Sequence, residues 1–130
     1  MPMTPQQYAA FTAALIQSVD QDDRVLGLLA AGSMAQQSHQ PDEWSDHDFW
    51  LIVKPEAVAW FRSKRTWLPH STRIVLMFAD PVHDGVTVIY DDAHLLEFAV
   101  SDRSVLLRAK VNDYNMLIDH VDLAADVERL

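Results

Sequence analysis

The feature that most constrains the fold is a short apolar run at residues 24–31 (RVLGLLAA), with an acidic turn before it and Gly32-Ser33 after it. A continuous apolar run of this length between turn residues is typical of a strand buried on both faces of a sheet. The run therefore predicts a buried strand, and the helical patterns on either side of it predict that helices cover the sheet.

The first helical pattern has a well-defined start. Thr4 is expected as the N-cap, Pro5 at the first helical position and Gln7 as the residue that closes a capping box. Residues 5–19 then follow the 3/4 spacing of an amphipathic helix. The expected buried face of this helix consists of Tyr8, Phe11, Ala14, Leu15 and Ser18.

The rest of the chain predicts an alternation of strands and helices. A short helix and a loop are expected over residues 34–45. Strands are expected at 46–54, 72–79, 86–90, 95–101 and 114–118, and helices at 55–67, 102–109 and from Asp122 onward. The strands at 86–90 and 95–101 flank a four-residue connection, which is the layout of a hairpin. The expected fold class is α/β (α+β), with a mixed central sheet flanked by helices.

Composition limits the classes of function. The 130 residues, 49% of them hydrophobic, fit a single domain over residues 1–130. Ten Lys and Arg against nineteen Asp and Glu give a net charge of −9, which disfavours nucleic acid as a partner. The absence of cysteine excludes disulfides, thiolate metal sites and cysteine nucleophiles. No signal peptide or membrane-spanning run is recognisable, so we expect a cytoplasmic protein without a membrane partner.

Asp46 and Asp48 are the first candidate site residues. At positions i and i+2 of a strand their side chains point to the same face. Two like charges held together repel each other, and a hard divalent cation such as Mg²⁺ relieves this repulsion. The alternative interpretation is a solvated acidic turn. His47, between them, is expected to face the opposite side of the strand and to pack there.

Gly32-Ser33 and Glu97 are further candidate site residues. Gly32 allows a backbone to pass close to a phosphate, and Ser33 can cap a helix whose N-terminal amides attract anions, although a plain N-cap is the simpler interpretation. Glu97 lies in an otherwise apolar strand, where a buried carboxylate needs a partner such as a metal ion. An edge-strand Glu that faces solvent is its alternative.

Together these residues resemble a known signature. Gly32-Ser33, a spacer and Ser45-Asp46-His47-Asp48, followed by the run FWLIV at 49–53, resemble the DNA polymerase beta-like nucleotidyltransferase superfamily. The nearest branches are the streptomycin and lincosamide adenylyltransferase types and the minimal nucleotidyltransferases. In these families a third carboxylate follows a hairpin, and Glu97 fits that position. The C-terminal helical domain of the antibiotic-modifying members has no counterpart within residues 1–130.

The resemblance implies a nucleotidyltransferase fold and a defined chemistry. A nucleoside monophosphate, expected to be AMP from Mg-ATP, is transferred to the hydroxyl of a small molecule such as an aminoglycoside-like antibiotic. Asp46, Asp48 and Glu97 are then the catalytic carboxylates and the ligands of two Mg²⁺ ions. Gly32 and Ser33 then bind the nucleotide phosphates. Whether Glu97 is a base or only a ligand stays open.

Two other interpretations remain. A minimal nucleotidyltransferase can AMPylate a helical protein partner, as in toxin–antitoxin pairs, and a domain of the same fold can persist as a non-catalytic binding module. A homodimer that builds a cleft from two chains is also compatible with the composition. The six histidines show no zinc-enzyme spacing, and Trp44 is the one tryptophan expected beside the site.

Overall fold

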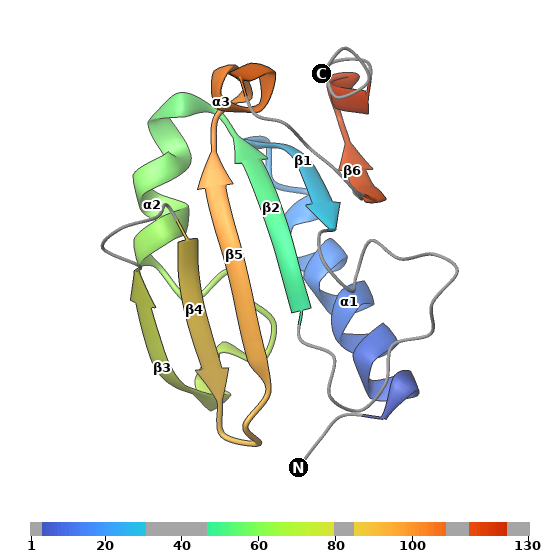
Figure 1. Ribbon diagram of the computed structural model, residues 1–130, viewed down its shortest axis with the longest axis vertical. Coiled ribbons are helices and arrows are strands. Elements are labelled where there is room, and N and C mark those ends of the chain that lie inside the picture. Colours follow the sequence, from blue (N-terminus) through green and yellow to red (C-terminus); the bar gives the residue numbers. More distant parts are fainter. Residues whose placement is uncertain (1–3, 31–46, 80–84, 109–114, 125–130) are drawn as a thin grey trace.

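A computed structural model describes residues 4–30, 47–79, 85–108 and 115–124 of the chain (Figure 1). Within them the order of elements is α1 (Pro5–Asp20), β1 (Val25–Ala30), β2 (His47–Val53), the 3₁₀ turn η2 (Pro55–Ala57), α2 (Val58–Ser63), the 3₁₀ turn η3 (Ser71–Arg73), β3 (Ile74–Ala79), β4 (Gly85–Tyr90), β5 (Leu95–Ser101), α3 (Arg103–Arg108) and β6 (Asn115–Asp119). The expected helix and loop at 34–45 lie outside the described residues.

The strands form one six-stranded mixed sheet in the order β3-β4-β5-β2-β1-β6. β2 and β5 are parallel, and the other neighbouring pairs are antiparallel. The chain connects these two parallel central strands through α2 and the β3–β4 hairpin, so residues nearly fifty positions apart become neighbours (Figure 1). The mixed α/β (α+β) class predicted from the sequence is therefore correct.

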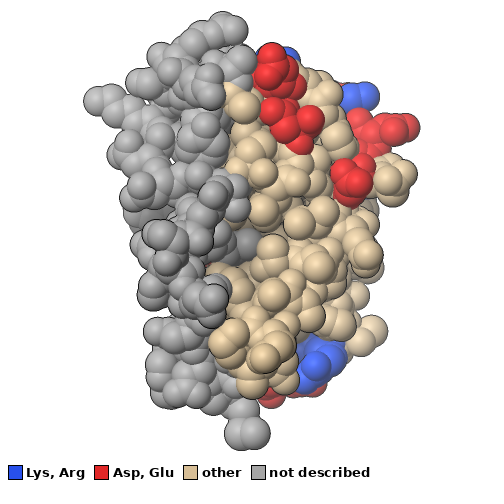
Figure 2. Space-filling view, turned by 90° about the vertical axis from the view of Figure 1, so that its right-hand side faces the viewer, with Lys and Arg blue, Asp and Glu red and all other residues tan. Residues whose placement is uncertain are grey.

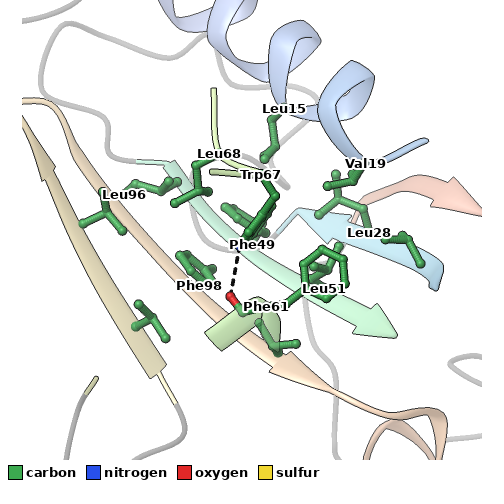
Figure 3. Close-up of a cluster of buried hydrophobic side chains, with 14 of the residues drawn as sticks. Leu15, Val19, Leu28, Phe49, Leu51, Phe61, Trp67, Leu68, Leu96 and Phe98 are labelled. Atoms are coloured by element: carbon green, nitrogen blue, oxygen red, sulfur yellow. Dashed lines mark hydrogen bonds between the residues drawn. The ribbon is translucent and has the colours of Figure 1, made fainter. Parts of the chain in front are cut away.

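The two faces of the sheet differ. On the inner face, which α1 and α2 cover, the alternate residues Phe49, Leu51 and Val53 of β2 belong to the main hydrophobic core. Leu15 and Val19 of α1 point into this core, and Trp67 packs between Phe49 and Phe61 (Figure 3). On the outer face β2 presents Asp48, Trp50 and Ile52, and a smaller cluster forms around Leu29, Ile52 and Leu123.

Helix α1 begins as its sequence predicts. The Thr4 hydroxyl accepts a hydrogen bond from the Gln7 backbone N–H (3.1 Å), and the Gln7 side chain accepts from the Thr4 backbone N–H (2.9 Å). The buried stripe is Tyr8, Phe11, Leu15 and Val19. The prediction of Ser18 on that face was wrong, because the packed face continues from Leu15 by four residues rather than three, and Ser18 is exposed.

The helix expected over residues 55–67 is much shorter. The structure has one 3₁₀ turn and then α2, which ends at Ser63, because Lys64 adopts extended dihedral angles. After this break the chain folds back, and the buried Trp67 indole donates a hydrogen bond to the Phe61 carbonyl (3.0 Å; Figure 3). Burial of the indole against the sheet therefore determines where this helix ends.

The remaining predictions are close to the observed elements. The β4–β5 hairpin, the helix α3 and the strand β6 form where the sequence indicated; Leu123 and Ala124 are helical, and the rest of the expected helical tail lies outside the described residues. β3 is an edge strand, and it carries the exposed large apolar side chains found among the described residues: Val75, Leu76 and Phe78. No helix in the described ranges combines the length and apolar character needed to cross a bilayer.

Candidate functional site

Asp48 and Glu97 are direct register partners on the parallel strands β2 and β5. Residues opposite each other in neighbouring strands point to the same face, so both carboxylates lie on the outer face of the sheet. Asp48 is half-buried and Glu97 is exposed. The structure thus brings together two candidate site residues that are far apart in the sequence.

The environment of Glu97 differs from the sequence-based expectation. The argument for a costly buried carboxylate was wrong because Glu97 faces away from the core, while its neighbours Leu96 and Phe98 are buried. The alternative was correct in that Glu97 faces solvent, but wrong about an edge strand, because β5 lies between β4 and β2 in the interior of the sheet. Glu97 is an exposed carboxylate on a central strand.

A groove of about 360 Å³ runs over this part of the outer face. Its polar lining residues are Asp48, Glu97 and Thr87, and Thr87 is the register partner of Glu97 on the β4 side. Trp50 also lines the groove, and its indole N–H is buried without a hydrogen-bond partner in the described part of the chain. The groove therefore combines a row of polar side chains with an indole ring.

The other predicted site residues lie outside the described part of the chain: Asp46, Gly32, Ser33 and Trp44. The structure shows only where the segment that contains these residues leaves β1 and where it enters β2. The chain leaves β1 at Ala30 and enters β2 at His47, and these two ends are adjacent because Ala30 pairs with Phe49.

The donor set fits a hard cation in part. Asp48 and Glu97 offer carboxylate oxygens on one face, which are the ligands that Mg²⁺ prefers. Among the residues that the structure describes, no group of three or more His, Cys, Asp or Glu is arranged to hold a metal ion. The third expected ligand, Asp46, is not among them.

His47 points to the inner face, as its position between the two aspartates predicted, and it is fully buried. Its Nδ1 lies 2.8 Å from His94 Nε2, and its Nε2 lies 3.0 Å from Thr12 Oγ1 and 3.2 Å from the Tyr8 carbonyl oxygen. The Tyr8 ring stacks on the imidazole at 3.8 Å. Burial, together with the neighbouring His94, lowers the pKa of His47 to about 3, so the imidazole is neutral at pH 7.

The histidine pair was missed by reasoning on sequence. His94 occupies a connection that reads as an ordinary turn, and its partner is 47 residues away. Tyr8 and Thr12, one helical turn apart in α1, both contact His47, but only in the folded chain. Only tertiary contacts identify the pair.

A second, smaller cavity of about 210 Å³ lies between α1 and the β4–β5 hairpin. It is lined by Phe11, His70, Arg73, Tyr90 and His94, among others. Arg73 forms an ion pair with Asp91 (2.7 Å), so its charge is neutralised locally. This cavity is on the inner side of the sheet and is separate from the groove at Asp48 and Glu97.

Acidic side chains also gather beyond the C-terminal end of α1. Figure 2 shows acidic side chains gathered at the upper end of the side that carries α1, where that helix ends and an acidic turn follows. The first residues of β2 and β5 lie at the lower end of the sheet (Figure 1). Asp48 and Glu97, near the starts of these strands, therefore lie toward the end of the sheet opposite to the acidic turn.

No protein-family model matches this chain, and no curated protein matches it at a significant level of similarity. The resemblance to nucleotidyltransferases therefore rests on the motifs in the sequence.

Proposed function

We propose that this domain is a metal-dependent nucleotidyltransferase that transfers AMP from Mg-ATP to the hydroxyl of a small molecule, such as an aminoglycoside-like antibiotic. The observation that carries the proposal is the pairing of Asp48 with Glu97 on adjacent parallel strands, beside one groove. Two carboxylates fixed on one face of a sheet offer the hard oxygen ligands that a nucleotide-bound Mg²⁺ accepts.

Each residue has a role in this proposal. Asp46, Asp48 and Glu97 would hold the divalent ions, and Gly32 and Ser33 would contact the phosphates. Divalent ions, when bound, neutralise charge on the attacking and leaving oxygens of such a transfer. Because Glu97 is exposed at the groove, its carboxylate is accessible to an acceptor hydroxyl and can take its proton.

A second candidate acceptor is a protein. Phe78 of the edge strand β3 is the register partner of Thr87, and Thr87 is in turn the register partner of Glu97. An exposed apolar strand thus adjoins the proposed site on the same face. Apolar surface of this kind is typical of contacts with proteins rather than with a cationic small molecule, and it favours AMPylation of a protein partner as the alternative.

Titration calorimetry with ATP in Mg²⁺ buffer tests the proposal. Wild type, Asp48→Asn, Glu97→Gln and the double variant Asp46→Ala/Asp48→Ala are compared. Matched controls are Asp23→Asn and Glu56→Gln, which remove exposed carboxylates elsewhere. We expect the site variants to weaken Mg-ATP binding at least about tenfold, equivalent to about 1.4 kcal/mol.

The controls are expected to bind like wild type, and omission of Mg²⁺ is expected to abolish binding by wild type. Absence of Mg-ATP binding by folded wild type would refute the enzyme and leave a binding module. If binding is found, incubation with labelled ATP and either aminoglycosides or a cell lysate distinguishes the two acceptors by the mass of the labelled product.

A further inference from the structure

A chain of hydrogen bonds crosses the inner face directly behind the proposed site. His47 at the start of β2 contacts His94, which immediately precedes β5, and it also contacts Thr12 and the Tyr8 carbonyl of α1. His47 is fully buried and His94 is 7% exposed. Three elements therefore meet at one imidazole.

The partners determine which nitrogen carries the proton. The Tyr8 carbonyl can only accept, and the Thr12 hydroxyl donates to that carbonyl (3.1 Å), so the hydroxyl accepts from His47. His47 Nε2 must then be the protonated nitrogen, and its Nδ1 is an acceptor. The 2.8 Å contact is consequently a hydrogen bond donated by His94 Nε2–H to His47 Nδ1. In this arrangement each of the contacts at His47 pairs a donor with an acceptor.

The pair lies very near the carboxylates along both strands. His47 directly precedes Asp48, with its side chain on the opposite face, and His94 is three residues before Glu97. Asp48 is the second residue of β2, where a strand frays easily, whereas the start of β5 near Glu97 is tied to β4 by the Tyr90 N–H bond to the His94 carbonyl (3.0 Å). The next side-chain contact between β2 and β5 on the inner face is the stack of Phe49 on Phe98. Stacking sets the distance between the strands, but it is not directional, so it does little to fix how residues of one strand align with those of the other.

We propose that His47 and His94 are positioning residues that hold the first residues of β2 and β5 in register, so that Asp48 and Glu97 face the same metal-bound nucleotide. This inference deepens the proposed function and rests on it for the identity of the ligand. The rings of Tyr8, Phe11 and Tyr90 pack against the pair, and His47 is fully buried, which strengthens the hydrogen bond that it accepts; His94 also lines the smaller cavity.

Two substitutions of His94 separate positioning from simple packing. Glutamine places an N–H donor where His94 Nε2 lies, whereas leucine fills comparable space without a donor. The readouts are amide hydrogen exchange of the metal-free, nucleotide-free protein and its affinity for Mg-ATP. Exchange is compared at Asp48 and Glu97 and at the far ends of the same strands, Ile52 and Ser101.

For His94→Leu we expect exchange at Asp48 and Glu97 to accelerate at least about tenfold more than at Ile52 and Ser101, and Mg-ATP affinity to fall at least about tenfold. His94→Gln is expected to restore both within about threefold of wild type. Equal acceleration at both ends of the strands, or identical behaviour of the two variants, would overturn the proposal.

If His94→Leu does not fold, Thr12→Val takes its place, because it removes a partner of His47 from a half-buried helical position at nearly constant volume. The same comparison of strand ends then applies. Failure of the proposed function is distinguishable: wild type that does not bind Mg-ATP refutes the enzyme, while the exchange pattern still decides whether the pair holds the two strands in register.

Discussion

Asp48 and Glu97, 49 positions apart in the chain, stand directly opposite each other on β2 and β5 and face the same side of the sheet. Like charges in directly opposed positions destabilise a sheet. We therefore expect their placement to cost folding stability when no cation is bound, as is common at sites selected for binding.

Removing one of these charges should stabilise the metal-free protein. We expect Glu97→Gln to raise the free energy of unfolding in EDTA by about 0.2–1 kcal/mol, and to lose the stabilisation that Mg²⁺ gives to wild type. Urea unfolding with EDTA and with Mg²⁺ measures both effects. Glu56→Gln, an exposed carboxylate next to Pro55, is the control and should change neither. A less stable Glu97→Gln in EDTA would contradict this prediction.

Acid should destabilise the protein through His47. Its folded pKa of about 3 lies below the ordinary value of about 6.5, because burial disfavours the charged imidazole. The unfolded chain therefore binds this proton at a higher pH than the folded chain does. The free energy of unfolding has its full value above about pH 6.5 and falls as the pH decreases, by up to about 1.4 kcal/mol per pH unit. Urea unfolding between pH 7 and 5 measures the slope, which His47→Gln should flatten.

His120 provides the opposite sign in the same experiment. The Val25 carbonyl and the Asp20 carboxylate raise its pKa in the folded state. Its contribution to stability is therefore full below the unfolded pKa and disappears as the pH rises through the folded value. His120→Gln should make the loss of stability on acidification steeper than in wild type, whereas an unchanged profile would show that this ion pair is not formed in solution.

Gly27 of β1 should not tolerate a side chain. A Cβ at this position would lie 2.3 Å from Leu123 Cδ1 and 2.9 Å from the Ile118 carbonyl oxygen, which is backbone and cannot move aside easily. We expect Gly27→Ala to destabilise the protein by about 1–3 kcal/mol in urea unfolding.

Gly85→Ala is the matched control, because among the described residues its Cβ would meet nothing closer than the Phe98 carbonyl oxygen at 3.9 Å. This substitution should be neutral, or stabilising by about 0.4–1 kcal/mol through the unfolded chain. Equal destabilisation by the two alanines would show that the close packing of Leu123 on β1 is incorrect.

The Tyr90 hydroxyl should contribute to stability. It is buried and donates a hydrogen bond to the Pro69 carbonyl (2.8 Å), and burial raises its pKa above the ordinary value, so it stays a donor at neutral pH. Tyr90→Phe keeps the ring and leaves that carbonyl without its partner. We expect a loss of about 1–3 kcal/mol in urea unfolding, and an unchanged midpoint would argue that water replaces the hydroxyl.

The candidate site was predictable only in part. The alternation of Asp46, His47 and Asp48 was enough to place His47 on the packed face, because side-chain direction in a strand follows from parity alone. That Glu97 is exposed on a central strand was not predictable, since the order of strands in the sheet depends on the crossover through α2 and the hairpin. His94 had no local signal, because its partner comes from a strand distant in the sequence.

The sequence by itself determined the features that depend on neighbouring residues. The cap of α1 at Thr4, the β4–β5 hairpin and the extent of the apolar strands follow from hydrogen bonds and burial patterns within a few residues. Tertiary structure alone decided the rest. The end of α2 depends on the burial of Trp67, the pairing of Asp48 with Glu97 on the register of β2 and β5, and the hydrogen bond of His47 with His94 on their shared inner face. The last two contacts join residues 47 and 49 positions apart, and no pattern of neighbouring residues in the sequence indicates that they meet.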